Sequence, residues 1–220
     1  TAIDCLCTDP PYSERTHAGQ RTGTSRDTTI DYEPLSPEMA REIAVSWAPR
    51  TRHWAIIFSD HVAQRWHEEA WAAVGWYVFS PVIWLKLHPV PRFAGDGPTN
   101  SAEYITVARP RKPVRGERAG SRPGDYRIKG SIPQSFVAGS KDINGMRAIV
   151  RDYTLPGDLI VDCFSGSGST LLAAAMEGRR AIGAEMDPRT YAKAVHRLQA
   201  GYTLPMFAPV NPAGDSLSVE

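Results

Sequence analysis

The stretch from residue 159 to residue 185 restricts the fold most, because its pattern predicts a strand, a glycine-rich turn, a helix and a second strand in direct succession. The first strand, Leu159-Ile160-Val161-Asp162-Cys163, is almost continuously apolar, and residues 180–185 repeat that character after one helix length. Strands without polar alternation are typical of parallel sheets that helices cover on both faces. We therefore expect a sheet of mostly parallel strands around this unit.

The same alternation of strands and helices continues along the rest of the chain, as apolar runs and apolar residues at helical spacing indicate. The expected strands are 3–8, 53–59, 76–85 and 104–108, and the expected helices begin near Ser36-Pro37, Val62, Met146 and Asp187-Pro188. A length of 220 residues suits one domain. The predicted fold over 1–220 is therefore α/β, with a doubly wound, mostly parallel Rossmann-like sheet that binds ligands at the carboxyl ends of its strands.

Residues 110–140 interrupt this alternation with little apolar content and many Arg, Gly and Pro residues, which predicts a short loop-rich insertion. The net charge of the chain is only +1, but basic side chains gather here, as suits contact with nucleic-acid phosphates. The candidates for this contact are Arg111, Lys112, Arg115, Arg118, Arg122, Arg127 and Lys129. From charge alone, a solvated flexible loop explains the cluster equally well.

The glycine-rich turn at residues 164–170 excludes two common ligands. A dinucleotide fingerprint requires a third glycine where Leu171 stands, and an ATP-binding P-loop requires a lysine that this turn lacks. Glu185 ends the next strand, where an acidic side chain can accept both hydroxyls of a ribose, although a helix cap is an equally open role for it. Asp162 could bind the amino group of a ligand or orient the turn.

Asp9-Pro10-Pro11-Tyr12 ends the first expected strand with two residues that cannot donate a backbone hydrogen bond. The Asp9 carboxylate and the Pro10 carbonyl can then face one donor, such as an exocyclic amine with two N–H bonds. Holding both protons favours a tetrahedral nitrogen whose lone pair can attack a methyl group, which is catalysis by positioning and electrostatics. Tyr12 can stack on the base. A base inside a duplex must first be flipped out.

These motifs, in this order, resemble those of the DNA amino-methyltransferases, which act on adenine N6 or cytosine N4. Asp9-Pro10-Pro11-Tyr12 is similar to the family's catalytic tetrapeptide, and residues 162–170 are similar to its Asp-Pro-Phe-Ala-Gly-Ser-Gly-Thr-Thr, with Cys163 and Ser165 as departures. The catalytic motif precedes the cofactor motif, as in the family's beta group, with a target-recognition insertion between them. Lys141 falls where the family has a lysine before the helix that packs over the methionine end of the cofactor.

The resemblance implies S-adenosyl-L-methionine as the cofactor and DNA, with a flipped-out or single-stranded base, as the partner. The implied catalytic residues are Asp9, Pro10, Pro11 and Tyr12. The implied cofactor-binding residues are Asp9, Lys141, Asp162, Phe164, Ser165, Gly166, Gly168, Thr170 and Glu185. No metal site is expected, because Cys5, Cys7 and Cys163 lack the spacing of metal ligands.

Aspartate in the first position of the tetrapeptide is typical of the family's adenine enzymes, so N6-adenine methylation is the expected reaction. N4-cytosine methylation is the near alternative, and RNA or a protein glutamine amide a more distant one. A catalytically silent DNA-binding module of the same fold is a further alternative, against which the intact Asp9, Gly166 and Gly168 argue. The likeness to small phage or prophage enzymes implies a cytoplasmic, nucleoid-associated protein of a restriction-modification type that can form a homodimer.

Two segments leave open questions. The chain enters an apolar strand directly after Thr1, so we expect further residues upstream. Residues 13–35 form a long polar loop directly after the catalytic turn, and loops of this length are usually functional or disordered. This loop could close over the target base, with Arg15, His17, Arg21 and Arg26 near phosphates, or it could be a plain surface loop.

Overall fold

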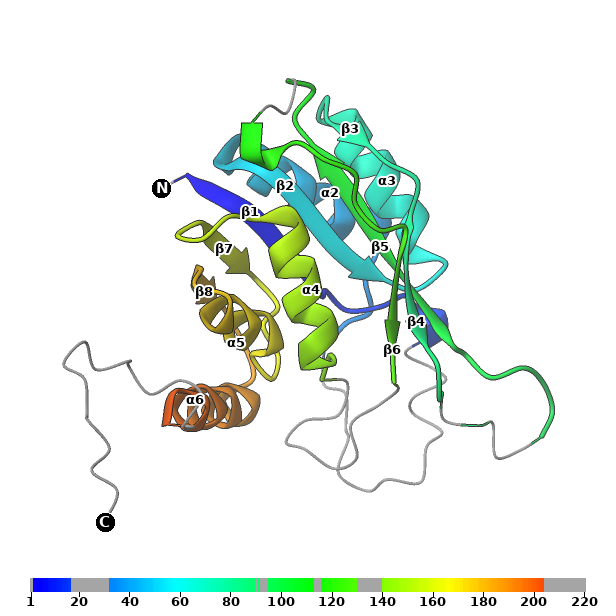
Figure 1. The fold of residues 1–220 in the computed structure, drawn as a ribbon. Helices are drawn as coiled ribbons and strands as arrows, with labels where there is room; N and C mark the ends of the chain where they lie inside the picture. The colour runs from blue at the N-terminus through cyan, green and yellow to red at the C-terminus, as the bar shows by residue number, and fades with distance from the viewer. Residues whose placement is uncertain are drawn as a thin grey trace, which may run out of the picture.

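The computed structural model of the chain describes residues 2–16, 32–89, 91, 95–112, 116–129 and 140–203. Its centre is an eight-stranded sheet with the strand order β6-β4-β5-β2-β1-β7-β8, and β3 pairs with β5 beside this path (Figure 1). Among the described residues, no helix is long and apolar enough to cross a membrane.

The elements follow the predicted alternation closely. The strands are β1 (Ile3–Thr8), β2 (Thr51–Ser59), β3 (Tyr77–Val78), β4 (Val82–Lys86), β5 (Ala102–Arg109), β6 (Asp125–Ile128), β7 (Leu159–Asp162) and β8 (Arg180–Gly183). The helices are α2 (Pro37–Trp47), α3 (Ala63–Ala73), α4 (Ile143–Tyr153), α5 (Ser169–Met176) and α6 (Pro188–Thr203), with short 3-10 helices η1 (Ala48–Arg50) and η2 (Gly116–Arg118).

The strand directions confirm a mostly parallel sheet. β1 runs parallel to both β2 and β7, and β7 runs parallel to β8. β5 is the reversed strand, antiparallel to β2, β3 and β4, while β6 joins the far edge parallel to β4. The carboxyl ends of β1, β2, β7 and β8 therefore meet at one edge of the sheet, which we call the catalytic edge, and their amino ends meet at the opposite, amino-end edge.

Helices cover both faces of this sheet, as a doubly wound fold requires (Figure 1). On one face Ile56 and Phe58 of β2 share a core cluster with Met146 and Ile149 of α4. On the other face Ile57 packs in a second cluster with residues of α2 and α3. All six residues of β1 are buried between these layers, so the residues directly after it emerge from the most constrained part of the molecule.

The segment 110–140 contains one strand that the sequence did not predict. Within it β6 is an ordered edge strand, because Tyr126 and Ile128 are buried while Arg127 between them is exposed, and this two-residue alternation pairs the segment with β4. Because β5 is reversed, the chain leaves Arg109 at the amino-end edge, and residues 110–112 and 116–124 follow there. Only the end of β6 returns the chain to the catalytic edge.

Candidate active site

The predicted catalytic tetrapeptide, residues 9–12, and the glycine-rich turn follow two neighbouring strands, so they lie side by side. β1 and β7 pair through Leu6 and Val161, and each strand ends a residue or two further on. Thr8 Oγ1 donates a 2.7 Å hydrogen bond to Asp162 Oδ1. The residue before Asp9 is thereby joined to the residue that opens the glycine-rich turn, so the two motifs form one site.

Asp9 presents its two carboxylate oxygens differently. Oδ2 lies 2.6 Å from Lys141 Nζ. Oδ1 is buried and has no hydrogen-bond partner among the described residues. Burial raises the pKa of Asp9 above its usual value, and the Lys141 charge opposes that rise. An unpaired buried acceptor is costly, so Oδ1 is the atom of this site most in need of a donor.

Lys141 lies between two carboxylates rather than against an open cleft. Its Nζ is 2.9 Å from Glu103 Oε2 and also donates to the Tyr12 hydroxyl at 3.0 Å. The Tyr12 hydroxyl in turn donates to Glu103 at 2.8 Å, and Lys86 Nζ lies 2.5 Å from the other Glu103 oxygen. Asp9, Tyr12, Lys86, Glu103 and Lys141 thus form one connected network, which we call the catalytic network.

The charges of the catalytic network are mutually supporting. Burial tends to raise the pKa of Glu103, but Lys141 and Lys86 outweigh it and lower that pKa to about 2. Burial likewise tends to lower the pKa of Lys141, but Asp9 and Glu103 raise it above its usual value. Burial and the neighbouring carboxylates raise the pKa of Tyr12, which keeps its hydroxyl protonated. The network therefore places two acidic side chains against two lysines.

The glycine-rich turn keeps its backbone open to a ligand. Gly166 and Gly168 have φ angles of 48° and 77°, in the left-handed region that favours glycine. A Cβ on Gly166 would meet nothing within 4 Å, so the chain there borders open space. The Gly166 N–H donates to Glu185 Oε2 at 2.9 Å, and the Asp187 N–H donates to Oε1 at 2.9 Å. Glu185 therefore ties the turn to the start of α6.

Of the remaining predicted cofactor-binding residues, one can contact a ligand and the others hold the turn in place. Asp162 is buried, which raises its pKa to about 6 despite the hydrogen bonds that it accepts. Ser165 Oγ donates to the Ala184 carbonyl at 3.1 Å, Thr170 is buried in the first turn of α5, and Phe164 packs against the core. The side chains of Ser165, Thr170 and Phe164 thus hold the turn in place, while the Asp162 carboxyl could accept a hydrogen bond from an amino group.

Both ends of the segment after the catalytic turn are fixed beside it. The Leu35 N–H donates to the Tyr12 carbonyl at 3.0 Å, and the Ser13 N–H donates to the buried Asp60 Oδ2 at 3.0 Å. Burial raises the pKa of the Tyr32 phenol, the charges of Asp9 and Glu185 add to that rise, and the Lys141 charge opposes it. Arg15 is exposed next to the turn. The predicted phosphate contacts His17, Arg21 and Arg26 lie outside the described residues.

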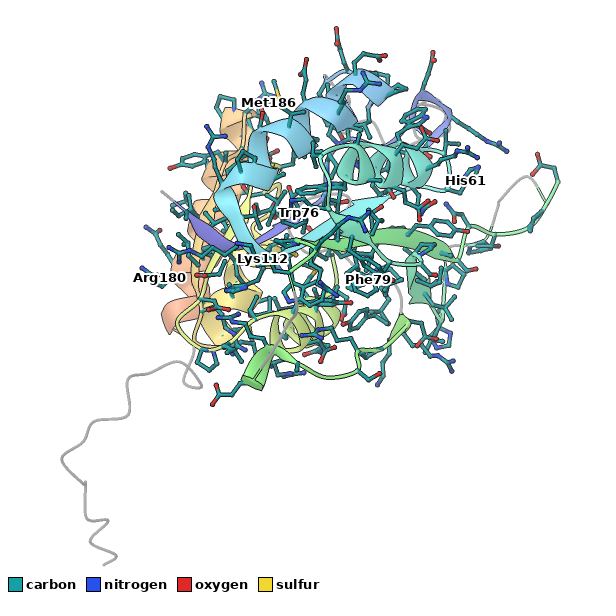
Figure 2. The ribbon with its side chains drawn as sticks, turned by 90° about the horizontal axis from the view of Figure 1, so that it is seen from above. His61, Trp76, Phe79, Lys112, Arg180 and Met186 are labelled. Carbon is teal, nitrogen blue, oxygen red and sulfur yellow. The ribbon has the colours of Figure 1, made fainter. Side chains whose placement is uncertain are left out.

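The basic cluster of residues 111–129 is divided between the two edges. Arg118 makes two 2.7 Å hydrogen bonds to the buried Asp158 at the amino-end edge. Arg122 stacks 4.5 Å over the Trp54 ring and donates to the Asp152 carbonyl, so both guanidinium groups serve the fold. Arg111 and Lys112 are exposed at the same edge, onto which Figure 2 looks and where it labels Lys112. Arg127 and Lys129 lie toward the catalytic edge, and Arg115 is outside the described residues.

Sequence reasoning missed four residues of this site, namely Lys86, Asp60, Glu103 and Tyr32. Glu103 and Lys86 are charged residues within or at the end of mostly apolar strands, a pattern that marks paired or functional charges. That signal was present in the sequence, but their meeting depends on the pairing of β4 with β5. Among the described residues, no group of His, Cys, Asp and Glu side chains is arranged to hold a metal ion.

Comparison with known proteins identifies relatives of this chain. A family model described as DNA methylase, N6_N4_Mtase, matches residues 3–196. The type II methyltransferase M.Cfr9I of Citrobacter freundii is 28% identical over an alignment of 136 residues, which covers 57% of this chain and only 45% of that enzyme.

Two solved structures share the fold. The M1.HpyAVI–SAM complex has a TM-score of 0.66 at 21% identity, covering 90% of this chain and 89% of its own. PvuII DNA methyltransferase, described as cytosine-N4-specific, has a TM-score of 0.59 at 16% identity, covering 91% and 84%. The chain therefore belongs to the DNA methylase family of N6-adenine and N4-cytosine amino-methyltransferases, whose methyl donor is S-adenosyl-L-methionine.

Proposed function

We propose that this protein transfers the methyl group of S-adenosyl-L-methionine to the exocyclic N6 of adenine in DNA. The observation that carries the proposal is the pair of Asp9 oxygens at the end of β1, one held by Lys141 and the other buried without a partner among the described residues. A target amine can supply the missing donor. The hydrogen bond from Thr8 to Asp162 keeps this acceptor next to the glycine-rich turn.

Asp9 would act by orientation. Its Oδ1 accepts one N–H of the amine, which localises the nitrogen lone pair toward the methyl group. A nitrogen–carbon bond then forms as the carbon–sulfur bond of the donor breaks, and the extra proton leaves the nitrogen to water. Burial raises the pKa of Asp9, and Lys141, which keeps Oδ2 paired, opposes that rise.

The cofactor would lie along the carboxyl ends of β7 and β8. Asp162 can accept from its ammonium group, and the backbone at Gly166, which borders open space, lets the donor approach closely. Glu185 would accept the hydroxyls of a ribose, and in this structure its oxygens accept the Gly166 and Asp187 amides. The S-adenosyl-L-methionine would supply the reactive methyl group, and these residues would bind and orient it.

The base must leave its stack to reach Asp9, because a duplex hides the exocyclic amine from the carboxylate. Tyr12 is the proposed stacking partner for the base, and its hydroxyl is held by Glu103 and Lys141. Adenine is favoured over cytosine by the aspartate in the first position of the tetrapeptide. A cytosine amine presents the same two N–H groups, so N4-cytosine methylation is the second candidate.

Methyl-labelled S-adenosyl-L-methionine and mixed-sequence DNA test the proposal when the product is digested to nucleosides and separated. We expect label in N6-methyladenine. Label in N4-methylcytosine instead would move the function to the second candidate. DNA binding without any label would identify a silent DNA-binding module. The matched variant Asp9→Ala should lose transfer and keep cofactor binding in a calorimetric titration, whereas loss of both would show that Asp9 has a different role.

A further inference from the structure

α6 carries a row of basic side chains that the proposed reaction does not use. Arg189, Lys193 and Arg197 are spaced four residues apart, so they follow one side of the helix. The sixteen residues of α6 also include His196 and contain no aspartate or glutamate. We call Arg189, Lys193 and Arg197 the α6 basic stripe. Like charges at this spacing destabilise a helix, so the stripe does not serve the stability of α6.

The α6 basic stripe lacks the carboxylate partners that several other cations of the fold have. Arg52, Lys86, Arg118 and Arg147 each lie against a carboxylate. Within the described parts of the chain, none of the three stripe residues forms an ion pair. The nearest acid before the helix, Asp187, is engaged by the Thr190 N–H and hydroxyl as a helix cap. Arg197 is partly buried, and that burial lowers its pKa without an opposing carboxylate.

The stripe begins at the rim of the active site. Arg197 Nη1 donates to Ser167 Oγ at 3.0 Å and to Ser169 Oγ at 2.9 Å, both in the glycine-rich turn. Ser169 Oγ donates to the carbonyl of Lys141, whose ammonium contacts Asp9. Figure 1 shows α6 across the lower end of the molecule beside α5, the end toward which the strands point. Lys193 and Arg189 are exposed.

We infer that the α6 basic stripe binds the phosphodiester backbone of duplex DNA that flanks the target base. The inference rests on the proposed function, because DNA at the active site is what brings phosphates to α6. It also assigns the main contact with DNA phosphates to α6 and not to Arg111 and Lys112, which are exposed at the opposite edge. Phosphate contacts of this kind hold the duplex in position and carry no sequence information.

The test compares two double variants by fluorescence anisotropy with a labelled mixed-sequence duplex of about three helical turns and S-adenosylhomocysteine present. Arg189→Gln/Lys193→Gln should weaken binding near 0.1 M salt by about tenfold for each phosphate-binding charge that is removed, and the slope of log affinity against log salt should fall by about 0.9 for each. Arg111→Gln/Lys112→Gln is the matched control and should leave both quantities unchanged. Arg197 is left intact because it contacts the glycine-rich turn.

The outcomes separate this inference from the proposed function, because binding is measured without methyl transfer. Weaker binding of the α6 variant supports the stripe even if no base becomes labelled. Equal binding by both variants, a larger loss in the control, or no binding of duplex DNA by the unchanged protein would overturn it. Tighter binding of duplex RNA than of DNA would overturn the choice of partner. Unchanged thermal unfolding of both variants would show that the effects come from binding.

Discussion

The two edges of the sheet carry the same residue types in different roles. At the amino-end edge, Asp158 accepts two hydrogen bonds from Arg118 and one from the Leu155 N–H, so its charge is fully paired. At the catalytic edge, Asp9 has one oxygen on Lys141 and the other without a partner among the described residues. Pairing lowers the pKa of Asp158, whereas burial raises that of Asp9. A satisfied carboxylate stabilises the fold, and an incompletely satisfied one is ready to bind a donor.

Two glutamates, one near each edge, are paired with cations in a similar way, so the contrast does not extend to them. Glu177 near the amino-end edge accepts from Arg147 and Arg151, much as Glu103 at the catalytic edge lies against Lys86 and Lys141. Both are acids between two cations, but of the two only Glu103 has a cation beside it, Lys141, that also contacts the proposed catalytic residues. Charge pairing by itself therefore does not identify an active site. What distinguishes the catalytic edge is that its charges converge on Asp9 and Tyr12.

The largest expected effect is at Asp9. Asp9→Asn should lower the methyl-transfer rate by about a thousandfold, because an amide loses the charge that orients the target amine. Unfolding temperature and cofactor affinity should stay close to those of the unchanged protein, since the substitution removes a buried charge and keeps the side-chain shape. Single-turnover transfer and calorimetry measure these quantities. A variant that keeps its transfer rate would contradict the role of the Asp9 carboxylate, and with it the contrast between the two edges.

At the amino-end edge, a substitution should lower the stability of the fold and leave the methyl-transfer rate unchanged. Arg118→Ala should lower the free energy of unfolding by about 2–3 kcal/mol, because it leaves the buried Asp158 carboxylate with only a backbone donor. The transfer rate per folded molecule should not change. Denaturant titration measures the first and active-site-normalised kinetics the second. Arg111→Ala, an exposed position on the same edge, is the control and should stay within about 0.5 kcal/mol.

Glu103→Gln tests whether Glu103 contributes to methyl transfer while Glu177 does not. The variant can still accept from Tyr12, but Lys141 loses one of its two carboxylates and should bind Asp9 more tightly, in competition with the target amine. We expect about a tenfold lower kcat/KM for DNA, which is about 1.4 kcal/mol, with partial recovery in Glu103→Asp. Glu177→Gln is the matched control. If both variants lose activity equally, the catalytic network is structural.

The smallest expected effect concerns Asp162, whose pKa is raised by burial to about 6. Below that pH the protonated carboxyl no longer attracts an ammonium group, so cofactor affinity should fall by about tenfold per pH unit and reach a plateau above about pH 7. Because the folded pKa is raised, Asp162 stabilises the fold less as pH rises from about 4 through 6. Calorimetric affinities across pH measure the first effect, and Asp162→Asn should flatten the curve.

Several features of the fold and site could be predicted from sequence because they rest on local patterns. The apolar strand of residues 3–8, the cap at Ser36 and the strand–turn–helix of residues 159–176 all occur where the pattern places them. The exclusion of a dinucleotide fingerprint also depends only on residue order. Edge strand β6 was missed because its four residues lie among arginines and glycines, although Tyr126 and Ile128 alternate correctly.

What the sequence determined by itself is the presence of two turns at strand ends and, through their order, the family. Only the tertiary structure decided which charges face them. The reversed strand β5 brings Glu103 to the catalytic edge and carries Arg111 and Lys112 to the other, a division that depends on strand direction and not on local composition. The pairing of β1 with β7 likewise joins Thr8 and Asp162, which are 154 positions apart in the chain, into one site. Local propensity cannot encode such contacts, because they form only when the strands pair in the folded sheet.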